Sequence, residues 1–468
     1  MCELIKKTLT GFFLLSLIFV FIGCIPIEAI EVPGATLQAT ALPPEQISRE
    51  EPQVSILPEK LSNGIKIQFW HPWSGETAVV VSELVDAFNQ ENPWGIQVEV
   101  TALGDDTTLV GAITAALENK GAPDLVAAPD FAIHGWFAEG QVADISEILS
   151  SSTWGLAETI KAAIPDVFWR TGEFDLSRIS LPAYRSARLL FYNISWANDL
   201  GFDKQPADIN EFKNQNCRAL QANSQDRDIT NNGTGGWFFD TESDTVLSWL
   251  KTFNGGVFPS KAEQPIRFAT DENINAYQYL FDLFHNDCAW LGRDDKPYMY
   301  FADRKTLTYS GRLEDILIQE RAEIIGGYDD EWTVMPYPGL NDKPVLLISG
   351  DSYAILNREP MQFVAAWVFA KWMVEAKQSA AIVEASGSFP VNINALGLLT
   401  DFRQKHPQWD KALQLLPFAQ SMPLNPAWLK IGSVIQDAAW QISQFNQQKS
   451  GIPTVIEQAE TLMNVLKN

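Results

Sequence analysis

Basic residues are scarce in this chain, and their scarcity excludes one large class of partner. The 468 residues include 34 Lys and Arg against 58 Asp and Glu, which gives a formal charge of −24 at pH 7. Proteins that bind nucleic acid neutralise phosphates with clustered Lys and Arg, and the sequence contains no such basic stripe. An acidic surface mainly serves solubility, although it could also steer a cation. We therefore expect no nucleic-acid partner.

Catalytic and phosphate-binding motifs are also missing. No G-x-S-x-G, H-E-x-x-H or P-loop pattern occurs. The four His residues are scattered along the chain as His71, His134, His285 and His406, and a lone His is more often structural than catalytic. Carboxylates are plentiful, so a secreted glycosidase that works with two of them stays open as an alternative. We expect a protein that is not an enzyme and that needs no cofactor and no metal ion.

The amino terminus has the form of an export signal. Two lysines precede an apolar run from Gly11 to Gly23, and Cys24 follows directly. This pattern resembles a bacterial lipoprotein signal, although Phe21 stands where Leu is usual. An uncleaved membrane anchor and ordinary signal cleavage are the alternatives. We predict a signal peptide over 1–23 and lipidation of Cys24, which would anchor the protein to the outer face of the cytoplasmic membrane. A periplasmic location is the alternative.

Residues 24–62 differ in composition from the rest of the chain. Prolines recur from Pro33 to Pro58 among Thr, Ala, Gln and Glu, without an apolar period. Such a sequence is typical of an extended, disordered tether. Beyond it, only Cys217 and Cys288 remain. They could form a disulfide in an oxidising compartment, but two separate buried thiols agree with the sequence nearly as well.

Strand and helix patterns alternate at the start of the folded part. Ile65, Ile67 and Phe69 alternate with polar residues, and helical spacing follows from Val81 to Phe88. The next patterns predict a strand, a helix and a short buried strand, at 96–100, 109–117 and 124–128. The order β-α-β-α-β predicts a parallel sheet with right-handed crossovers. Ligands bind at the carboxyl ends of such strands, which here carry Trp70, His71, Trp73 and Asp130.

The middle and the end of the chain predict a second lobe and a return to the first. The apolar patterns favour strands at 189–191, 307–311, 345–348 and 353–356. We expect a polar loop over 215–236, and helices from 194 to 201, over 273–284, 312–319 and 361–384, and from 428 to about 445.

A series of longer segments carries a resemblance to a known family. They are, in order, IQFWHPWSGETAVVVSELVDAFNQENP, GAPDLVAAPD, HGWFAEGQVADISEIL, LPAYRSARLLFYN, GGWFFDTESDTVLSWLKTFNGGVF, LTYSGRLEDI, VMPYPG and VLLISGDSYAILN. In this order they resemble the family 1 extracellular solute-binding proteins. These are lipid-tethered or periplasmic receptors of ABC importers, and they include maltose-binding and glycerol-3-phosphate-binding proteins.

The resemblance implies an α/β fold and a mode of action. The fold is the type II periplasmic-binding-protein fold, with a hinged cleft between two mixed, mainly parallel sheets that carry helices on both faces. The first lobe would comprise 63–160 and 345–405, and the second 161–344 and 406–468. A monomer of this kind captures a small-molecule solute by closure and presents it to the permease subunits of an ABC transporter.

The same resemblance, read with the strand ends and turns, predicts the ligand-binding residues. Aromatic rings would cover the apolar face of a sugar, carboxylates would accept hydroxyl protons, and arginines with backbone amides would donate. The family often has an aromatic residue after Gly311, whereas this chain has Arg312. The predicted set is Trp70, His71, Trp73, Ser74, Gly75, Asp130, Tyr184, Arg185, Trp237, Ser310, Gly311, Arg312, Gly350, Asp351, Ser352 and Trp428.

The predicted residues point to two different kinds of solute. The tryptophans favour a carbohydrate, either a mono- or an oligosaccharide. His71, Arg185 and Arg312 would instead suit glycerol-3-phosphate or another phosphorylated solute. A structural surface lipoprotein without a small ligand is a further alternative. The sequence favours the carbohydrate.

Overall fold

The computed structural model describes residues 57–119, 121–259, 264–293, 297–340 and 343–467. The predicted signal peptide, Cys24 and most of the predicted tether lie outside these residues. The end of that tether, 57–62, packs on the folded part, because Leu57 and Leu61 contact its core and Trp154 Nε1 donates to the Pro58 carbonyl at 2.7 Å. No helix within the described residues combines the length and the apolar character needed to cross a membrane.

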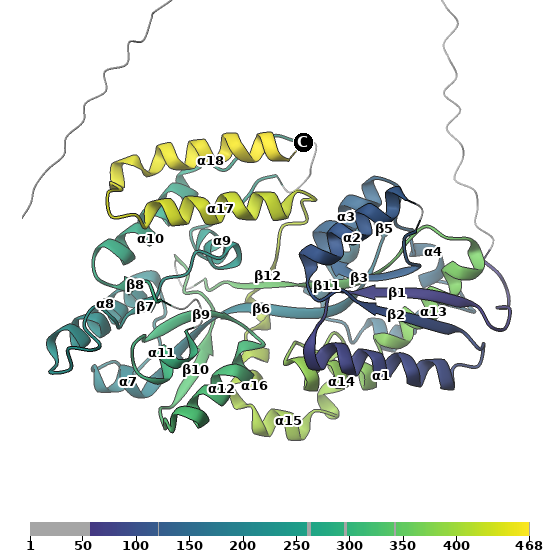
Figure 1. Ribbon diagram of the computed structural model, residues 1–468, viewed down its shortest axis with the longest axis horizontal. Helices are drawn as coiled ribbons and strands as arrows, with labels where there is room; N and C mark the ends of the chain where they lie inside the picture. The colour runs from purple at the N-terminus through teal and green to yellow at the C-terminus, as the bar shows by residue number, and fades with distance from the viewer. Residues whose placement is uncertain (1–56, 120, 260–263, 294–296, 341–342, 468) are drawn as a thin grey trace, which may run out of the picture. The chain divides into compact units, whose positions relative to one another are not determined.

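A mixed sheet of ten strands organises the described residues (Figure 1). Its order is β2-β1-β3-β11-β6-β9-β7-β8, with β10 paired to β6 and β12 paired to β11. A separate hairpin joins β4 (Glu173–Phe174) to β5 (Ser177–Arg178). The ten strands are β1 (Lys66–His71), β2 (Gln97–Ala102), β3 (Leu125–Pro129), β6 (Leu181–Asn193), β7 (Trp237–Phe238), β8 (Ala289–Trp290), β9 (Thr308–Arg312), β10 (Trp332–Met335), β11 (Leu346–Ile355) and β12 (Ala419–Ser421).

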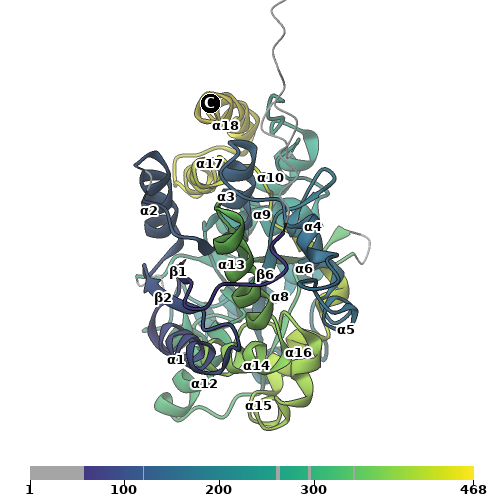
Figure 2. The same cartoon turned by 90° about the vertical axis from the view of Figure 1, so that its right-hand side faces the viewer.

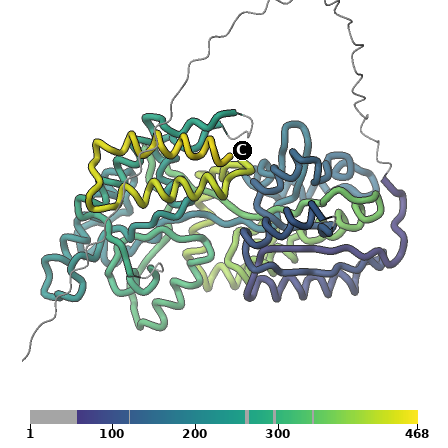
Figure 3. Tube along the Cα trace, turned by 45° about the horizontal axis from the view of Figure 1, so that its top comes forward, coloured from purple at the N-terminus to yellow at the C-terminus, as the bar shows by residue number. Residues whose placement is uncertain are grey.

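Helices cover both faces of this sheet. They are α1 (Gly75–Glu91), α2 (Asp106–Glu118), α3 (Asp130–Ala138), α4 (Ser146–Leu149), α5 (Glu158–Lys161), α6 (Asp166–Trp169), α7 (Ile194–Asp199), α8 (Ile209–Gln225), α9 (Ser243–Thr252), α10 (Asp271–His285), α11 (Tyr298–Ala302), α12 (Asp315–Gly326), α13 (Pro360–Met373), α14 (Ala376–Ser386), α15 (Thr400–Lys405), α16 (Pro407–Leu413), α17 (Trp428–Ile442) and α18 (Ile452–Leu466). The C-terminal pair α17 and α18 lies beside α9 and α10, which come from the middle of the chain (Figure 3).

The predicted β-α-β-α-β unit is confirmed. Strand β1 pairs in parallel with β2 and with β3, as β-α-β crossover connections require. Apolar residues on one side of β1 pack with α1 and α13, whereas α2 and α3 pack on the opposite face of β3 (Figures 1 and 2). The alternation of buried and exposed residues along β1 therefore gave a reliable signal.

Two long antiparallel strands, β6 and β11, join the two parts of the sheet. The prediction of two separate strands at 345–348 and 353–356 is wrong, because both belong to one strand, β11, which also includes the residues between them. Gly350 allows this, because its φ is +144° and a Cβ there would lie 2.1 Å from the Tyr184 carbonyl oxygen. A register shift between Asp351 and Ser352 follows, so the strand continues past an irregular point.

Two other predictions need correction. The expected helix 361–384 is divided into α13 and α14, because the backbone of Glu375 is extended. The expected polar loop 215–236 is helical as far as Gln225, since Phe212, Ala219 and Leu220 give α8 a buried face that its polar residues obscure.

Cys217 and Cys288 form a disulfide, which decides between the two alternatives that the sequence left open. The bond joins α8 to the residue before β8 across a sequence separation of 71 residues. A cross-link over such a loop stabilises the fold mainly by restricting the unfolded chain.

Trp237 lies in the protein core. Its exposed fraction is 0%, and the rings of Phe212, Phe239 and Trp249 surround it at centroid distances of 6.2, 5.4 and 5.6 Å. His71 is also buried, at 1% exposure, and its ring stacks on Trp73 at 5.0 Å. Both side chains therefore contribute to stability.

We predict that Trp237→Ala lowers the free energy of unfolding by about 3–5 kcal/mol, because it leaves a large cavity among rings that cannot close together. Urea unfolding measures the change. Trp440→Ala is the matched control, since Trp440 on α17 is 51% exposed and should change stability by less than about 0.5 kcal/mol. Equal losses in the two variants would contradict the core position of Trp237.

We predict that His71 makes the fold sensitive to acid. Burial lowers the pKa of His71 from 6.5 to about 4, so the unfolded chain binds the additional proton between these two values. Stability is therefore complete above pH 6.5 and falls by roughly 3 kcal/mol as the pH decreases to about 4. His71→Phe cannot take up this proton and should lose correspondingly less stability between pH 7 and pH 4 in urea unfolding. The same acid loss in both proteins would refute the prediction.

Candidate functional site

A cavity of about 450 Å³ lies where β6 and β11 meet the surrounding helices. Its lining combines segments that are far apart in sequence, and the two long strands supply several of its polar groups. The lining residues are Asp106, Thr107, Pro129, Asp130, Phe131, Thr171, Tyr184, Arg185, Ser186, Ser243, Asp244, Arg312, Glu314, Ile348, Ser349, Gly350, Asp351, Met422, Pro423, Leu424, Trp428 and Leu429.

The cavity brings together part of the predicted ligand-binding set. Seven of those residues line it, namely Asp130, Tyr184, Arg185, Arg312, Gly350, Asp351 and Trp428. The other nine are not among its lining residues, and these are Trp70, His71, Trp73, Ser74, Gly75, Trp237, Ser310, Gly311 and Ser352.

Most of the nine support neighbouring groups or pack in a core. Trp73 is 7% exposed, and its Nε1 donates to Asp351 Oδ2 at 2.7 Å. Trp73 therefore orients a carboxylate that lines the cavity without lining the cavity itself. Trp70 is partly buried against the core beside α2 and α3, and Trp237 is fully buried in another core.

Small residues account for the remainder. Ser74 and Gly75 stand exposed at the start of α1. Ser310 and Gly311 are buried on β9, where a Cβ on Gly311 would lie 2.6 Å from the Phe191 ring. The Ser352 hydroxyl donates to Asp130 Oδ1 at 2.6 Å and therefore orients a lining residue.

Arg185 connects the elements below the cavity. Its exposed fraction is 0%, and Nη2 donates to Thr171 Oγ1 at 2.7 Å and to Ser352 Oγ at 2.9 Å. The same nitrogen lies 3.3 Å from Asp130 Oδ2, and Nη1 donates to the Tyr184 carbonyl at 2.8 Å. These contacts occupy the terminal nitrogens, so Arg185 holds the site together and offers little to a ligand.

The carboxylates of the cavity differ in their surroundings. Burial raises the pKa of Asp351 well above its usual range, and the charge of Asp106 adds to this, against the Trp73 hydrogen bond. Burial also raises the pKa of Glu314, whose oxygens accept from Tyr184 Oη at 2.8 Å and Ser186 Oγ at 2.7 Å. Both side chains are held as acceptors of hydrogen bonds.

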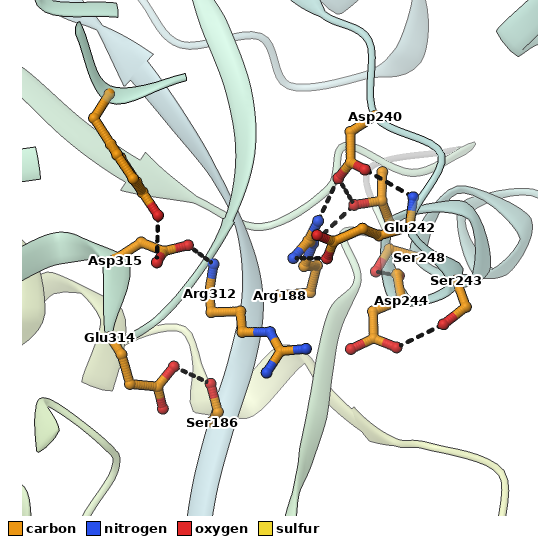
Figure 4. A network of polar contacts seen from close by, with 12 residues as sticks. Ser186, Arg188, Asp240, Glu242, Ser243, Asp244, Ser248, Arg312, Glu314 and Asp315 are labelled. Carbon is orange, nitrogen blue, oxygen red and sulfur yellow. Dashed lines mark hydrogen bonds and ion pairs between the residues drawn. The ribbon is translucent and has the colours of Figure 1, made fainter. Parts of the chain in front are cut away.

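Arg312 is the cationic group that stays available to a ligand. Its guanidinium has no hydrogen-bond or ion-pair partner among the described residues, and only its backbone N–H is used, donating to Asp315 Oδ2 at 2.7 Å. Figure 4 shows the guanidinium between Glu314 and Asp244. Loss of water in the cavity lowers its pKa, but the charges of Asp244 and Glu314 outweigh this and raise it, so Arg312 remains protonated.

Sequence reasoning missed three carboxylates of the lining, Asp106, Asp244 and Glu314. Asp106 and Asp244 lie in the first turns of α2 and α9, where acidic residues are common for helix stability alone. Glu314 stands two residues after Arg312, and this proximity was the one available signal. Within the described residues, no group of three or more His, Cys, Asp or Glu is arranged to hold a metal ion.

The chain is similar to proteins of known structure and to curated relatives. At the sequence level, the chain is 22% identical over 426 residues to the sn-glycerol-3-phosphate-binding periplasmic protein UgpB of Escherichia coli O1:K1, over 85% of this chain and 92% of that protein. The solved structure of the sugar-binding protein MalE from Xanthomonas citri has a TM-score of 0.72 at 16% identity, over 86% of this chain and 97% of that chain. The structure of UgpB from Mycobacterium tuberculosis, in complex with glycerophosphocholine, has a TM-score of 0.68 at 17% identity, over 86% of this chain and 98% of that chain.

These similarities confirm the predicted fold class, an α/β fold of periplasmic binding proteins. The relatives are named for the solutes that they bind and not for a reaction. A family model described as bacterial extracellular solute-binding protein matches residues 83–428. The chain belongs to the family of bacterial extracellular solute-binding proteins.

Proposed function

We propose that this chain is the substrate-binding component of an ABC importer and that its cavity captures a carbohydrate. The observation that carries the proposal is the composition of the lining, in which five carboxylates accompany two guanidinium groups. Arg185 uses both of its terminal nitrogens for protein partners, whereas the whole guanidinium of Arg312 has no partner among the described residues.

A neutral polyol matches this arrangement better than an anion does. Sugar hydroxyls donate to carboxylate oxygens and accept from a guanidinium, so adjacent hydroxyls can connect Arg312 with Asp244 or Glu314. A phosphate would gain Arg312 but would also meet the surrounding carboxylates at close range. Trp428, Tyr184 and Phe131 add apolar ring surface to the lining, which suits the C–H face of a sugar.

The connection through β6 and β11 supports a mechanism by closure. The cavity takes residues from α2 and α3 on one part of the sheet and from α9, β9 and α17 on the other. A ligand that contacts both parts stabilises the conformation in which they approach, and this conformation is what a permease would recognise. We assign the first lobe to 63–160 and 345–405 and the second to 161–344 and 406–468, with a lipid anchor at Cys24.

Glycerol-3-phosphate or another phosphorylated solute is the second candidate. One specific observation favours it, since the unpartnered guanidinium of Arg312 is a good donor to a phosphate oxygen. Relatives named for glycerol-3-phosphate support the same alternative.

We predict that a panel of solutes separates these candidates in thermal unfolding of residues 57–468. The panel contains mono- and oligosaccharides, glycerol-3-phosphate, glycerophosphodiesters and, as the negative set, amino acids. A ligand at about a hundred times its dissociation constant should add about 2.7 kcal/mol to the free energy of unfolding. Stabilisation by sugars alone supports the proposal, whereas stabilisation by phosphorylated compounds alone replaces it with the second candidate.

We also predict that Arg312→Gln weakens binding of the stabilising solute by about 10- to 100-fold, because it removes charged hydrogen bonds worth roughly 1.5–3 kcal/mol. Isothermal titration calorimetry measures the dissociation constant. Arg321→Gln is the matched control, since Arg321 is exposed on α12 and does not line the cavity. Unchanged affinity in Arg312→Gln would show that the ligand binds elsewhere.

A further inference from the structure

A second cavity, of about 430 Å³, lies next to the first. Its lining comes from β6, β7, β9, the residues before α9, the residues around 291–293, α11, α12 and α17. The lining residues are Arg188, Phe238, Phe239, Asp240, Thr241, Glu242, Leu291, Gly292, Arg293, Pro297, Tyr298, Ser310, Asp315 and Gln436. None of them lines the first cavity, although Asp315 accepts the backbone N–H of Arg312, which does.

The pleat of two strands places both cavities on the same face of the sheet. On β6, Ser186 lines the first cavity and Arg188 the second, and residues two apart point to the same face. On β9, Arg312 lines the first cavity and Ser310 the second in the same way. Because Arg188 is paired with Arg312 in the strand register, the row that these two residues form is the boundary between the cavities.

The segment before α9 crosses this boundary as well. Thr241 and Glu242 line the second cavity, and Ser243 and Asp244, which come next, line the first. A molecule bound at Asp244 and Arg312 would therefore lie next to the second cavity, on the side of Glu242.

Arg188 makes this boundary rigid. It is 5% exposed, its Nε donates to Thr245 Oγ1 at 2.7 Å, and its Nη1 lies 2.9 Å from Glu242 Oε2 (Figure 4). Its Nη2 pairs with Asp240, which also accepts from the Glu242 backbone N–H at 2.7 Å. The ion pairs fix the positions of Asp240 and Glu242, although the Glu242 side chain, which lines the second cavity, stays 58% exposed.

The chemistry of the second cavity matches that of a sugar unit. Glu242 and Asp240 present carboxylate oxygens that accept from hydroxyl groups. Tyr298 and Phe238 offer ring surface, and the Tyr298 hydroxyl is oriented by its hydrogen bond to Asp315 Oδ1 at 2.9 Å.

We infer that the second cavity is an outer subsite that binds a further sugar unit of an oligosaccharide whose first units occupy the main cavity. This inference rests on the proposed function, because it assigns the length of the carbohydrate that the protein captures. A monosaccharide would fill the main cavity alone, whereas a longer chain would continue past Arg188 and Arg312 to Glu242 and Tyr298.

The test compares affinity across chain length. Dissociation constants are measured by calorimetry for glucose and for its α-1,4-linked and β-1,4-linked oligomers of two, three and four units, with residues 57–468. The wild type should bind at least one series more tightly as the chain grows. Glu242→Gln, which removes the charge but keeps the size, should weaken the four-unit ligand about tenfold and the shortest bound ligand less than twofold.

A second variant addresses the cavity without touching the ion pairs. Leu291 is 42% exposed and lines only the second cavity, so Leu291→Trp should fill it and produce the same selective loss for long ligands. The matched controls are Glu384→Gln and Leu462→Trp, which change exposed residues outside both cavities and should leave every dissociation constant unchanged.

Each result is decisive. A loss confined to long ligands in both variants supports the outer subsite. Equal effects on short and long ligands, or no effect, overturn the subsite but leave the carbohydrate function standing. If no sugar of either series binds to the wild type while glycerol-3-phosphate does, the proposed function and the subsite fall together.

Discussion

The burial of one guanidinium group determines how this molecule is organised. A fully desolvated charge such as that of Arg185 is stable only if hydrogen-bond acceptors and a counter-charge surround it. The chain supplies them from Asp130 at the start of α3, Thr171, Ser352 on β11 and the Tyr184 backbone on β6 itself. Segments that are far apart in sequence thus meet at one cation, and the cavity lies directly against it.

The surroundings of this cation explain why the cavity is rich in acceptors. Asp130 pairs with Arg185, and both Asp130 and Asp351 line the cavity. Burial raises the pKa of Asp351 well above its usual range. Glu314 is in turn held by Tyr184 and Ser186, whereas Arg312 keeps its donors. A site built in this way offers fixed acceptors and one free cationic donor, which is a pattern suited to ligands with many hydroxyl groups.

The sequence predicts regular patterns well and tertiary encounters poorly. The elements from β1 to α2 were predictable because one face of each is buried, as Ile67 and Val85 show. Strand β3 was predictable as a short apolar run, because all of its residues are buried. Strand β11 was predicted as two strands because the polar segment from Ser349 to Ser352 interrupts its apolar pattern, although Gly350 lets the strand pass Tyr184. Seven predicted site residues line the cavity, but Asp244 and Glu314 were missed, because the sequence around a single carboxylate does not show which distant residues lie beside it in the fold. Nor can a sequence distinguish a ring in a core, such as Trp237, from a ring at a ligand.

The continuous sheet has a mechanical consequence. Strands β6 and β11 share a ladder of hydrogen bonds through the region of Gly350 and Asp351, so the two parts of the sheet cannot slide past each other without breaking that ladder. A pair of hydrogen-bonded strands twists more readily than it slides. The irregular register between Asp351 and Ser352 interrupts the regular ladder at one place and makes twisting easier there. Asp351 stands at this irregular point and also lines the cavity, so a torsion of the two strands would change the shape of the cavity.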